Sequence, residues 1–122
     1  MNNFQLNSKL MDFISLTQES QLDEIDQRSA QKLQAIFKHS TRCSVSSFAQ
    51  RVLKSEFSSE IENQVDIHHL DLISFRNVSN AIADRYHVVH ESPQLLLIKE
   101  GKCIYNASHS DVSLEKALKH IA

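Results

Sequence analysis

Short apolar runs alternate with amphipathic segments along most of this chain, and that alternation restricts the fold more than any other feature of the sequence. Each of the first three strand-like runs is followed by apolar residues at the spacing of one helix face. The predicted strand and helix pairs are Phe13–Leu16 with Gln18–Ala30, Leu33–Phe37 with Cys43–Phe57, and Val65–Leu72 with Ser74–Tyr86, the last helix with Ser74 as its N-cap. Strands that alternate with helices favour parallel pairing through right-handed crossovers.

The pattern changes in the C-terminal third of the chain. Two strand-like runs, Leu95–Ile98 and Cys103–Ala107, flank a short loop that carries Gly101, the only glycine. Such a pair is typical of an antiparallel hairpin. A closing helix is predicted over Val112–Ile121. The complete order βαβαβαββα predicts an α/β protein with a thioredoxin-like fold, in which helices flank a central mixed sheet and the C-terminal hairpin is antiparallel.

The basic residues do not gather into one surface. The formal net charge is −2. Four basic residues near the first strands fall in different predicted elements and are interpreted as solvated: Arg28, Lys32, Lys38 and Arg42. For Lys38 and His39, at the strand end, the alternative is that one of them faces the active site. A nucleic-acid partner is therefore not expected, because no basic stripe is available to neutralise phosphates.

Length and hydropathy predict one soluble domain. We expect residues 1–122 to fold as a single domain, with residues 1–12 as a loosely ordered N-terminal segment. That segment lacks the apolar core of a signal peptide, and runs such as Leu95–Ile98 are far too short to span a bilayer. Two cysteines without a secretory signal favour a reducing compartment. The expected location is the cytoplasm.

Cys43 lies at the junction between the second predicted strand and the helix that follows it. Unpaired backbone N–H groups and the positive end of the helix dipole favour a thiolate at such a position. A dithiol oxidoreductase places a second cysteine three residues further on, where this chain has Ser46. The sequence therefore predicts a nucleophilic cysteine with single-thiol chemistry.

Three neighbours are candidates to support the Cys43 thiolate. Arg42 can add a positive charge, although a solvated arginine is an equally good interpretation. Thr41 can donate a hydroxyl hydrogen bond to the sulfur or cap the helix. Ser46, one helical turn after Cys43, can reach the sulfur without forming a disulfide.

Pro93, the only proline, directly precedes the third-to-last predicted element, the strand over Leu95–Ile98. In thioredoxin-like folds a cis-proline at this place faces the active-site cysteine and leaves the preceding backbone open to a substrate strand. The resemblance of fold thus implies a docking role for Ser92 and Pro93. The alternative is a trans proline that opens an edge strand.

Cys103 and the histidines predict structure rather than chemistry. Cys103 lies inside a predicted strand, and free cysteines are among the most buried residues, so a structural thiol is the favoured reading. The alternative is a distant resolving cysteine, which requires a large movement. His68 and His69 are adjacent on a strand and should point to opposite faces. We therefore expect no metal site.

Four blocks of the sequence resemble the monothiol bacilliredoxin family, in the expected order, from about Leu16 to the C-terminus. The blocks are Lys38-His39-Ser40-Thr41-Arg42-Cys43 with Ser46 after it, residues 71–80, residues 90–94, and Ala107-Ser108-His109. The chain departs from the family pattern at Ser44, where the family usually has a proline. A proline there removes an N–H donor and fixes φ.

The resemblance implies a cytosolic thiol–disulfide oxidoreductase that removes bacillithiol from S-bacillithiolated protein cysteines through a mixed disulfide at Cys43. Bacillithiol is then a co-substrate, no cofactor is bound, and the partners are bacillithiolated client proteins. Three alternatives stay open. Ser40, three residues before Cys43, partly imitates a peroxiredoxin motif; a glutaredoxin-like role with glutathione has similar chemistry; and a non-catalytic thioredoxin-like module can bind a partner through the Pro93 face.

Overall fold

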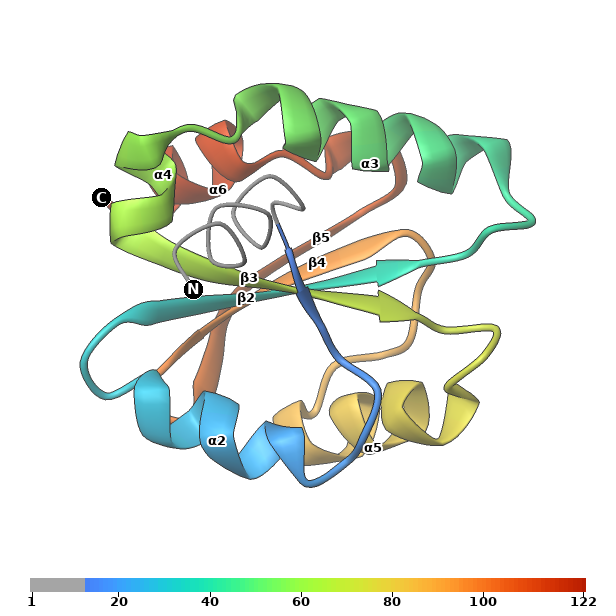
Figure 1. The fold of residues 1–122 in the computed structure, drawn as a ribbon, viewed down its shortest axis with the longest axis horizontal. Helices are drawn as coiled ribbons and strands as arrows, with labels where there is room; N and C mark the ends of the chain where they lie inside the picture. The colour runs from blue at the N-terminus through green and yellow to red at the C-terminus, as the bar shows by residue number, and fades with distance from the viewer. Residues whose placement is uncertain (1–12) are drawn as a thin grey trace, which may run out of the picture.

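The computed structural model describes residues 13–122, which form a five-stranded sheet with helices on both faces (Figure 1). The strands are β1 Ile14–Ser15, β2 Leu33–His39, β3 Val65–Asp71, β4 Gln94–Lys99 and β5 Lys102–Ser108, and they lie in the order β1-β3-β2-β4-β5. β1, β3 and β2 pair in parallel, whereas β4 is antiparallel to both β2 and β5. The predicted mixed sheet with its C-terminal hairpin is confirmed. The expectation of a loosely ordered segment over 1–12 lies outside the described residues.

Helices cover the sheet in two layers. One face carries α3 Ser44–Glu56, α4 Ser59–Gln64 and α6 Leu114–Ile121, and the other carries α2 Gln21–Arg28 and α5 Arg76–Tyr86 (Figure 1). A short 3₁₀ turn, His109–Asp111, connects β5 to α6. Within the described part of the chain, no helix is both long and apolar enough to cross a bilayer.

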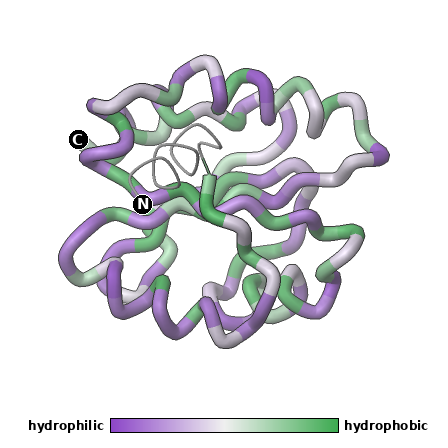
Figure 2. Tube along the Cα trace, in the orientation of Figure 1, coloured by the Kyte–Doolittle hydropathy of each residue, from purple (hydrophilic) through white to green (hydrophobic). Residues whose placement is uncertain are grey.

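The core is divided by the sheet into two apolar clusters. Along β2, Ile36 packs with the α2 and α5 side, whereas Ala35 and Phe37 pack with the α3 and α6 side. Leu95–Ile98 of β4 are buried on both faces. Along the surrounding helices hydrophilic residues recur between hydrophobic ones, as expected for amphipathic helices packed on a sheet (Figure 2). The alternation of β2 continues past Phe37. Lys38 therefore faces the α5 side of the sheet, and His39 faces the α3 side.

The predicted helix starts lie one to three residues before the observed ones, and two of these shifts have a visible cause. The first helix begins at Gln21 instead of Gln18, because the Gln21 side-chain oxygen accepts the Thr17 and Gln18 N–H groups at 2.8 and 3.0 Å and holds a turn before the helix. In α5, Phe75 is the N-cap instead of Ser74. The Ser74 hydroxyl donates to the Asp71 carboxylate at 2.9 Å and is thereby drawn back toward β3.

The helix α4 was not predicted. Its six residues are too few to show a helical period, and none of them is buried. Its N-cap is Ser58, whose hydroxyl accepts the Ile61 N–H at 3.2 Å. Serine is a preferred N-cap residue, so Ser58 was the signal for this helix in the sequence.

Candidate active site around Cys43

Cys43 is the N-cap of α3, at the end of the loop that leaves β2. The helix was predicted to start at Cys43 and in fact starts at Ser44, with Cys43 in extended conformation at φ −122° and ψ 122°. Its C=O accepts the Ser47 N–H at 3.1 Å, and its thiol makes no capping hydrogen bond. The residue is half-exposed. The thiol therefore lies at a helix N-terminus, where backbone N–H groups have no partner inside the helix.

Ser44 occupies the first position of α3 and is exposed. A proline in this place would have no N–H, and its φ would already suit a helix start. Ser44 instead keeps its amide, so the first turn after Cys43 presents one more N–H group than the family pattern provides.

Ser46 is fully buried, and its hydroxyl joins the strand end to the helix start. The Ser40 N–H donates to Ser46 Oγ at 2.9 Å, and His39 Nδ1 lies 2.7 Å from the same oxygen. Burial lowers the pKa of His39, so the neutral ring can accept the Ser46 proton. The hydrogen bonds of Ser46 thus fix the loop around Cys43, and they run to Ser40 and His39 and not to the sulfur.

Thr41 and Arg42 lie on the surface of the loop before Cys43. The Arg42 N–H donates to Ser40 Oγ at 3.3 Å, which holds its backbone. Among the described residues, no hydrogen bond or ion pair engages the side chain of Thr41 or Arg42. Both side chains are therefore available to the thiol or to a bound substrate.

The Ser92–Pro93 peptide bond is cis, as predicted. Pro93 is buried and Ser92 is half-buried. The bond leads directly into β4, whose first residue, Gln94, pairs with Lys38 near the end of β2. The His109 N–H donates to the Pro93 C=O at 3.0 Å. Among the described residues, the backbone of Ser92 takes part in no hydrogen bond, so its N–H and C=O can pair with an added chain.

The prediction that Lys38 is solvated was wrong. Its side chain is completely buried on the α5 side of the sheet. Nζ donates to the Ser79 C=O at 3.2 Å and lies 3.2 Å from His90 Nδ1. Burial lowers the pKa of Lys38 to about 8. The sequence did contain a signal for this burial: Lys38 lies two residues after the apolar Ile36, so the two side chains share one face of the strand.

Cys103 lies at the opposite end of the sheet from Cys43. It pairs with Ile98, which in turn pairs with Gln34 near the start of β2. Gln34 and His39 are five residues apart, or roughly 16 Å along the strand. Cys103 Sγ lies 3.3 Å from the Tyr105 C=O, and burial raises the pKa of its thiol. This is the position expected of a structural thiol.

The histidines are distributed over both sides of the sheet. His68 Nε2 lies 2.8 Å from Gln34 Oε1, and His69 Nε2 lies 2.6 Å from Gln50 Oε1 on α3, so the two rings face opposite layers as predicted. Within residues 13–122 no group of three potential metal ligands comes together.

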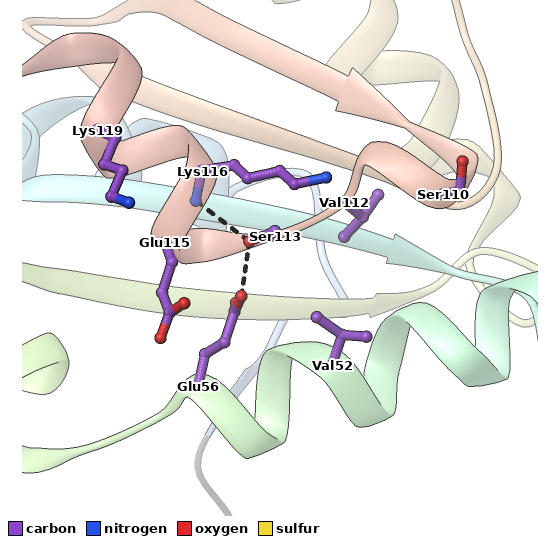
Figure 3. A pocket seen from close by; sticks show the side chains of 8 residues that line it. All are labelled: Val52, Glu56, Ser110, Val112, Ser113, Glu115, Lys116 and Lys119. Atoms are coloured by element: carbon purple, nitrogen blue, oxygen red, sulfur yellow. Dashed lines mark hydrogen bonds between the residues drawn. The ribbon is translucent and has the colours of Figure 1, made fainter.

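A cavity of about 310 Å³ lies between the C-terminal half of α3 and the start of α6 (Figure 3). Glu56 points across it and accepts the Ser113 hydroxyl at 2.6 Å and the Leu114 N–H at 2.7 Å. Glu56 ends the helix that Cys43 precedes, so these two residues are roughly 20 Å apart along the helix axis. The cavity is therefore separate from the Cys43 site.

Comparison with solved structures identifies the fold. A thioredoxin-fold protein described as an oxidoreductase is 26% identical, with a TM-score of 0.76 over 89% of this chain and 93% of the other. Thioredoxin from Malassezia sympodialis (Mala s 13) is 15% identical, with a TM-score of 0.72 over 90% and 91%. Mitochondrial thioredoxin 3 from Saccharomyces cerevisiae is 20% identical, with a TM-score of 0.67 over 90% and 96%. The predicted thioredoxin-like fold is confirmed.

Family comparison agrees with the site. The family model described as monothiol bacilliredoxin BrxC matches residues 14–117. The match spans β1 to α6 and includes Cys43, Ser46 and the Ser92–Pro93 loop. Fold and family together indicate a thioredoxin-like oxidoreductase with a thiol redox function. The chain belongs to the monothiol bacilliredoxin family.

Proposed function

We propose that this protein removes bacillithiol from S-bacillithiolated protein cysteines, with Cys43 as the only catalytic thiol. The observation that supports this proposal is the set of residues at the start of α3. A half-exposed cysteine lies at the helix N-terminus, and the position of a second cysteine is filled by a buried serine whose hydroxyl is held by Ser40 and His39. A thiolate in this setting can form a mixed disulfide that no neighbouring thiol resolves.

The reaction consists of two thiol–disulfide exchanges. The Cys43 thiolate attacks the bacillithiol sulfur of the capped client, and an S–S bond forms between them as the S–S bond to the client breaks. The client leaves as a thiolate and takes up a proton from water. The thiolate of a second, free bacillithiol then attacks the bacillithiol sulfur of the Cys43 mixed disulfide. This exchange releases bacillithiol disulfide and restores the Cys43 thiolate. Bacillithiol is therefore a co-substrate, and the cycle needs no bound cofactor.

The residues around Cys43 receive distinct roles in this proposal. The free side chains of Arg42 and Thr41 support the thiolate from the surface of the loop, by charge and by a hydroxyl group. Ser46 acts by fixing the loop. An extended segment of the client pairs with the open backbone of Ser92, beside Pro93, as an added β-strand.

The proposed location is the cytoplasm. Both Cys43 and Cys103 are free thiols in the structure, which suits a reducing compartment. The co-substrate of the second exchange is itself a free thiol, and its supply requires the same conditions.

The test uses one client protein with a single cysteine, capped with bacillithiol in one sample and with glutathione in the other. Intact mass should show a single bacillithiol transferred to the wild-type protein and none to Cys43→Ser. Equal transfer of the glutathione cap would instead indicate a glutaredoxin-like enzyme. Thiol-driven consumption of peroxide would indicate a peroxiredoxin-like one. Full biological function of Cys43→Ser would indicate a binding module.

A further inference from the structure

Lys38 is a fully buried cation without an anionic partner. Its exposed fraction is 0%. Among the described residues its Nζ contacts the Ser79 C=O and His90 Nδ1, each at 3.2 Å, and no carboxylate. Lysine is almost never fully buried unless it is paired with an anion, because the loss of hydration is costly. A lysine kept in this place therefore serves a purpose that an apolar side chain would not serve.

The contacts of Lys38 join three parts of the fold. Lys38 belongs to β2, five residues before Cys43, while Ser79 belongs to α5 and His90 to the loop that leads to Pro93. Ser79 Oγ also lies 3.4 Å from His90 Nδ1. The ammonium group thus connects the strand that leads to the reactive cysteine with the loop that carries the open backbone of Ser92.

The other attachments of this loop run to its own ends and to the turn after β5, where Glu91 Oε1 lies 3.3 Å from His109 Nε2. The Gln94 side-chain amide donates to the Val89 C=O at 3.0 Å, and the His109 N–H donates to the Pro93 C=O at 3.0 Å. Between them, the bond from Lys38 to His90 is the attachment to β2. Without it, the segment before Ser92 would lose its link to the strand that precedes Cys43.

The protonation states fit this arrangement. The pKa of Lys38 is lowered to about 8 by burial, so the side chain is mainly an ammonium at neutral pH. Burial and then the charge of Lys38 lower the pKa of His90, which favours a neutral ring whose Nδ1 accepts from the ammonium. Lys38 thereby donates to two acceptors on different elements. Methionine, of similar length, can donate to neither.

We propose that Lys38 is a positioning residue that fastens the loop over 90–93 to β2, so that the backbone of Ser92 is already arranged when a client protein docks. This inference rests on the proposed function and adds to it a determinant of client recognition. Lys38 acts through His90 and touches neither the sulfur nor the client. A protein client needs the loop, whereas a small disulfide needs only access to Cys43.

The first experiment compares Lys38→Met with Lys102→Met, which alters an exposed lysine on β5. Lys38→Met should raise KM for a bacillithiolated protein client on the order of 5- to 20-fold and leave kcat within about twofold, because it removes binding shared by ground and transition states. Its rate with bacillithiol disulfide alone should stay within about twofold of wild type. The Lys102→Met control should resemble wild type in both reactions.

A double-mutant cycle tests whether Lys38 acts through His90. His90 is exposed, so His90→Ala should fold normally. If both variants break the same contact, the KM of the double variant should match that of Lys38→Met, and the two effects should not multiply. Multiplying effects would overturn the inference. An equal loss with the small disulfide would also overturn it, because Lys38 would then act on Cys43 itself.

A third measurement does not depend on the proposed reaction. The His109 amide donates to the Pro93 C=O, so its hydrogen exchange reports opening of the loop. Lys38→Met should speed this exchange about tenfold or more relative to wild type and Lys102→Met. Unchanged exchange would refute the positioning role even if the enzyme proved to use another cap. Faster exchange without any bacillithiol transfer would refute the proposed function and leave the loop attachment supported.

Discussion

The regions around the two cysteines differ in what surrounds each sulfur. Cys43 follows the end of β2, where buried polar groups hold the backbone: Ser46 accepts the Ser40 N–H, and His39 contacts the same hydroxyl. Cys103 lies in the edge strand β5 and packs against the apolar cluster of α2 and α5. Both thiols are half-buried, so exposure alone does not distinguish them.

The difference lies in the groups that each sulfur can meet. At Cys43 the nearest fixed backbone is the N-terminus of α3, whose N–H groups favour negative charge. At Cys103 the thiol donates to the Tyr105 C=O at 3.3 Å, and burial raises the pKa of this thiol. The comparison shows that exposure does not distinguish the two thiols, whereas a helix N-terminus lies at Cys43 and not at Cys103.

The largest expected effect is the difference in client release rate between the Cys43→Ser and Cys103→Ser variants. Cys43→Ser should reduce the release of a bacillithiol-capped client by about 1000-fold or more, to the uncatalysed rate, because the attacking sulfur is gone. Cys103→Ser should stay within about twofold of wild type. Release rates measured by client mass would show it. A severe loss in Cys103→Ser would break the comparison.

The second prediction concerns the lifetime of the intermediate. The wild-type adduct with one bacillithiol should persist until an external thiol is added, since Ser46 cannot resolve it and Cys103 lies at the other end of the sheet. Ser46→Cys places a thiol one helical turn from Cys43 and should shorten that lifetime about 100-fold or more, with an internal disulfide as product. Intact mass over time distinguishes these outcomes. Spontaneous formation of a Cys43–Cys103 disulfide in the wild type would contradict the monothiol assignment.

The third prediction concerns how the free energy of unfolding depends on pH through Lys38, near the Cys43 region. The pKa of Lys38, just before the Cys43 loop, falls from 10.5 to about 8 on burial. Between these values the unfolded chain binds the proton and the folded chain does not, so the free energy of unfolding rises with pH. The gain in the free energy of unfolding from this group is about 3 kcal/mol across the whole window.

Urea unfolding of wild type and Lys38→Met at pH 7 and pH 10 measures this gain. The wild type should gain stability relative to Lys38→Met as the pH rises, because all other groups that titrate are shared by the two proteins and cancel. Lys102→Met, which removes an exposed lysine of β5, serves as a control from the other region and should follow the wild-type response. A constant difference between wild type and Lys38→Met at both pH values would show that Lys38 keeps its ordinary pKa.

The smallest expected effect is in the reaction of the thiols with a small alkylating reagent. At neutral pH Cys43 should react about tenfold faster than Cys103, because burial raises the pKa of the Cys103 thiol and so reduces its reactive thiolate fraction. Peptide mapping after partial labelling gives both rates in one sample. Equal rates would remove the electrostatic distinction between the regions, although the positional one would remain.

Local features of the chain were predictable. The order of strands and helices followed from apolar spacing, and the hairpin followed from two runs around Gly101, which adopts φ +75°. The place of Cys43 next to a helix start followed from the same periodicity, to within one residue. The cis bond before Pro93 followed from the resemblance of fold. The start of α2 and the whole of α4 were missed, because a side-chain bond from Gln21 and a cap from Ser58 are not part of a periodic pattern.

By itself, the sequence determined the class of fold, the place of Cys43 at a helix start and the serine in place of a second cysteine at position 46, since each depends on residues within a turn or two of one another. Only the tertiary structure decided which polar groups are buried next to the loop that leads to Pro93. Lys38 meets Ser79 and His90 across 41 and 52 residues of sequence, and a lysine's hydration is lost only when α5 and the loop close over it. Its burial is therefore a property of packed elements that no local pattern contains.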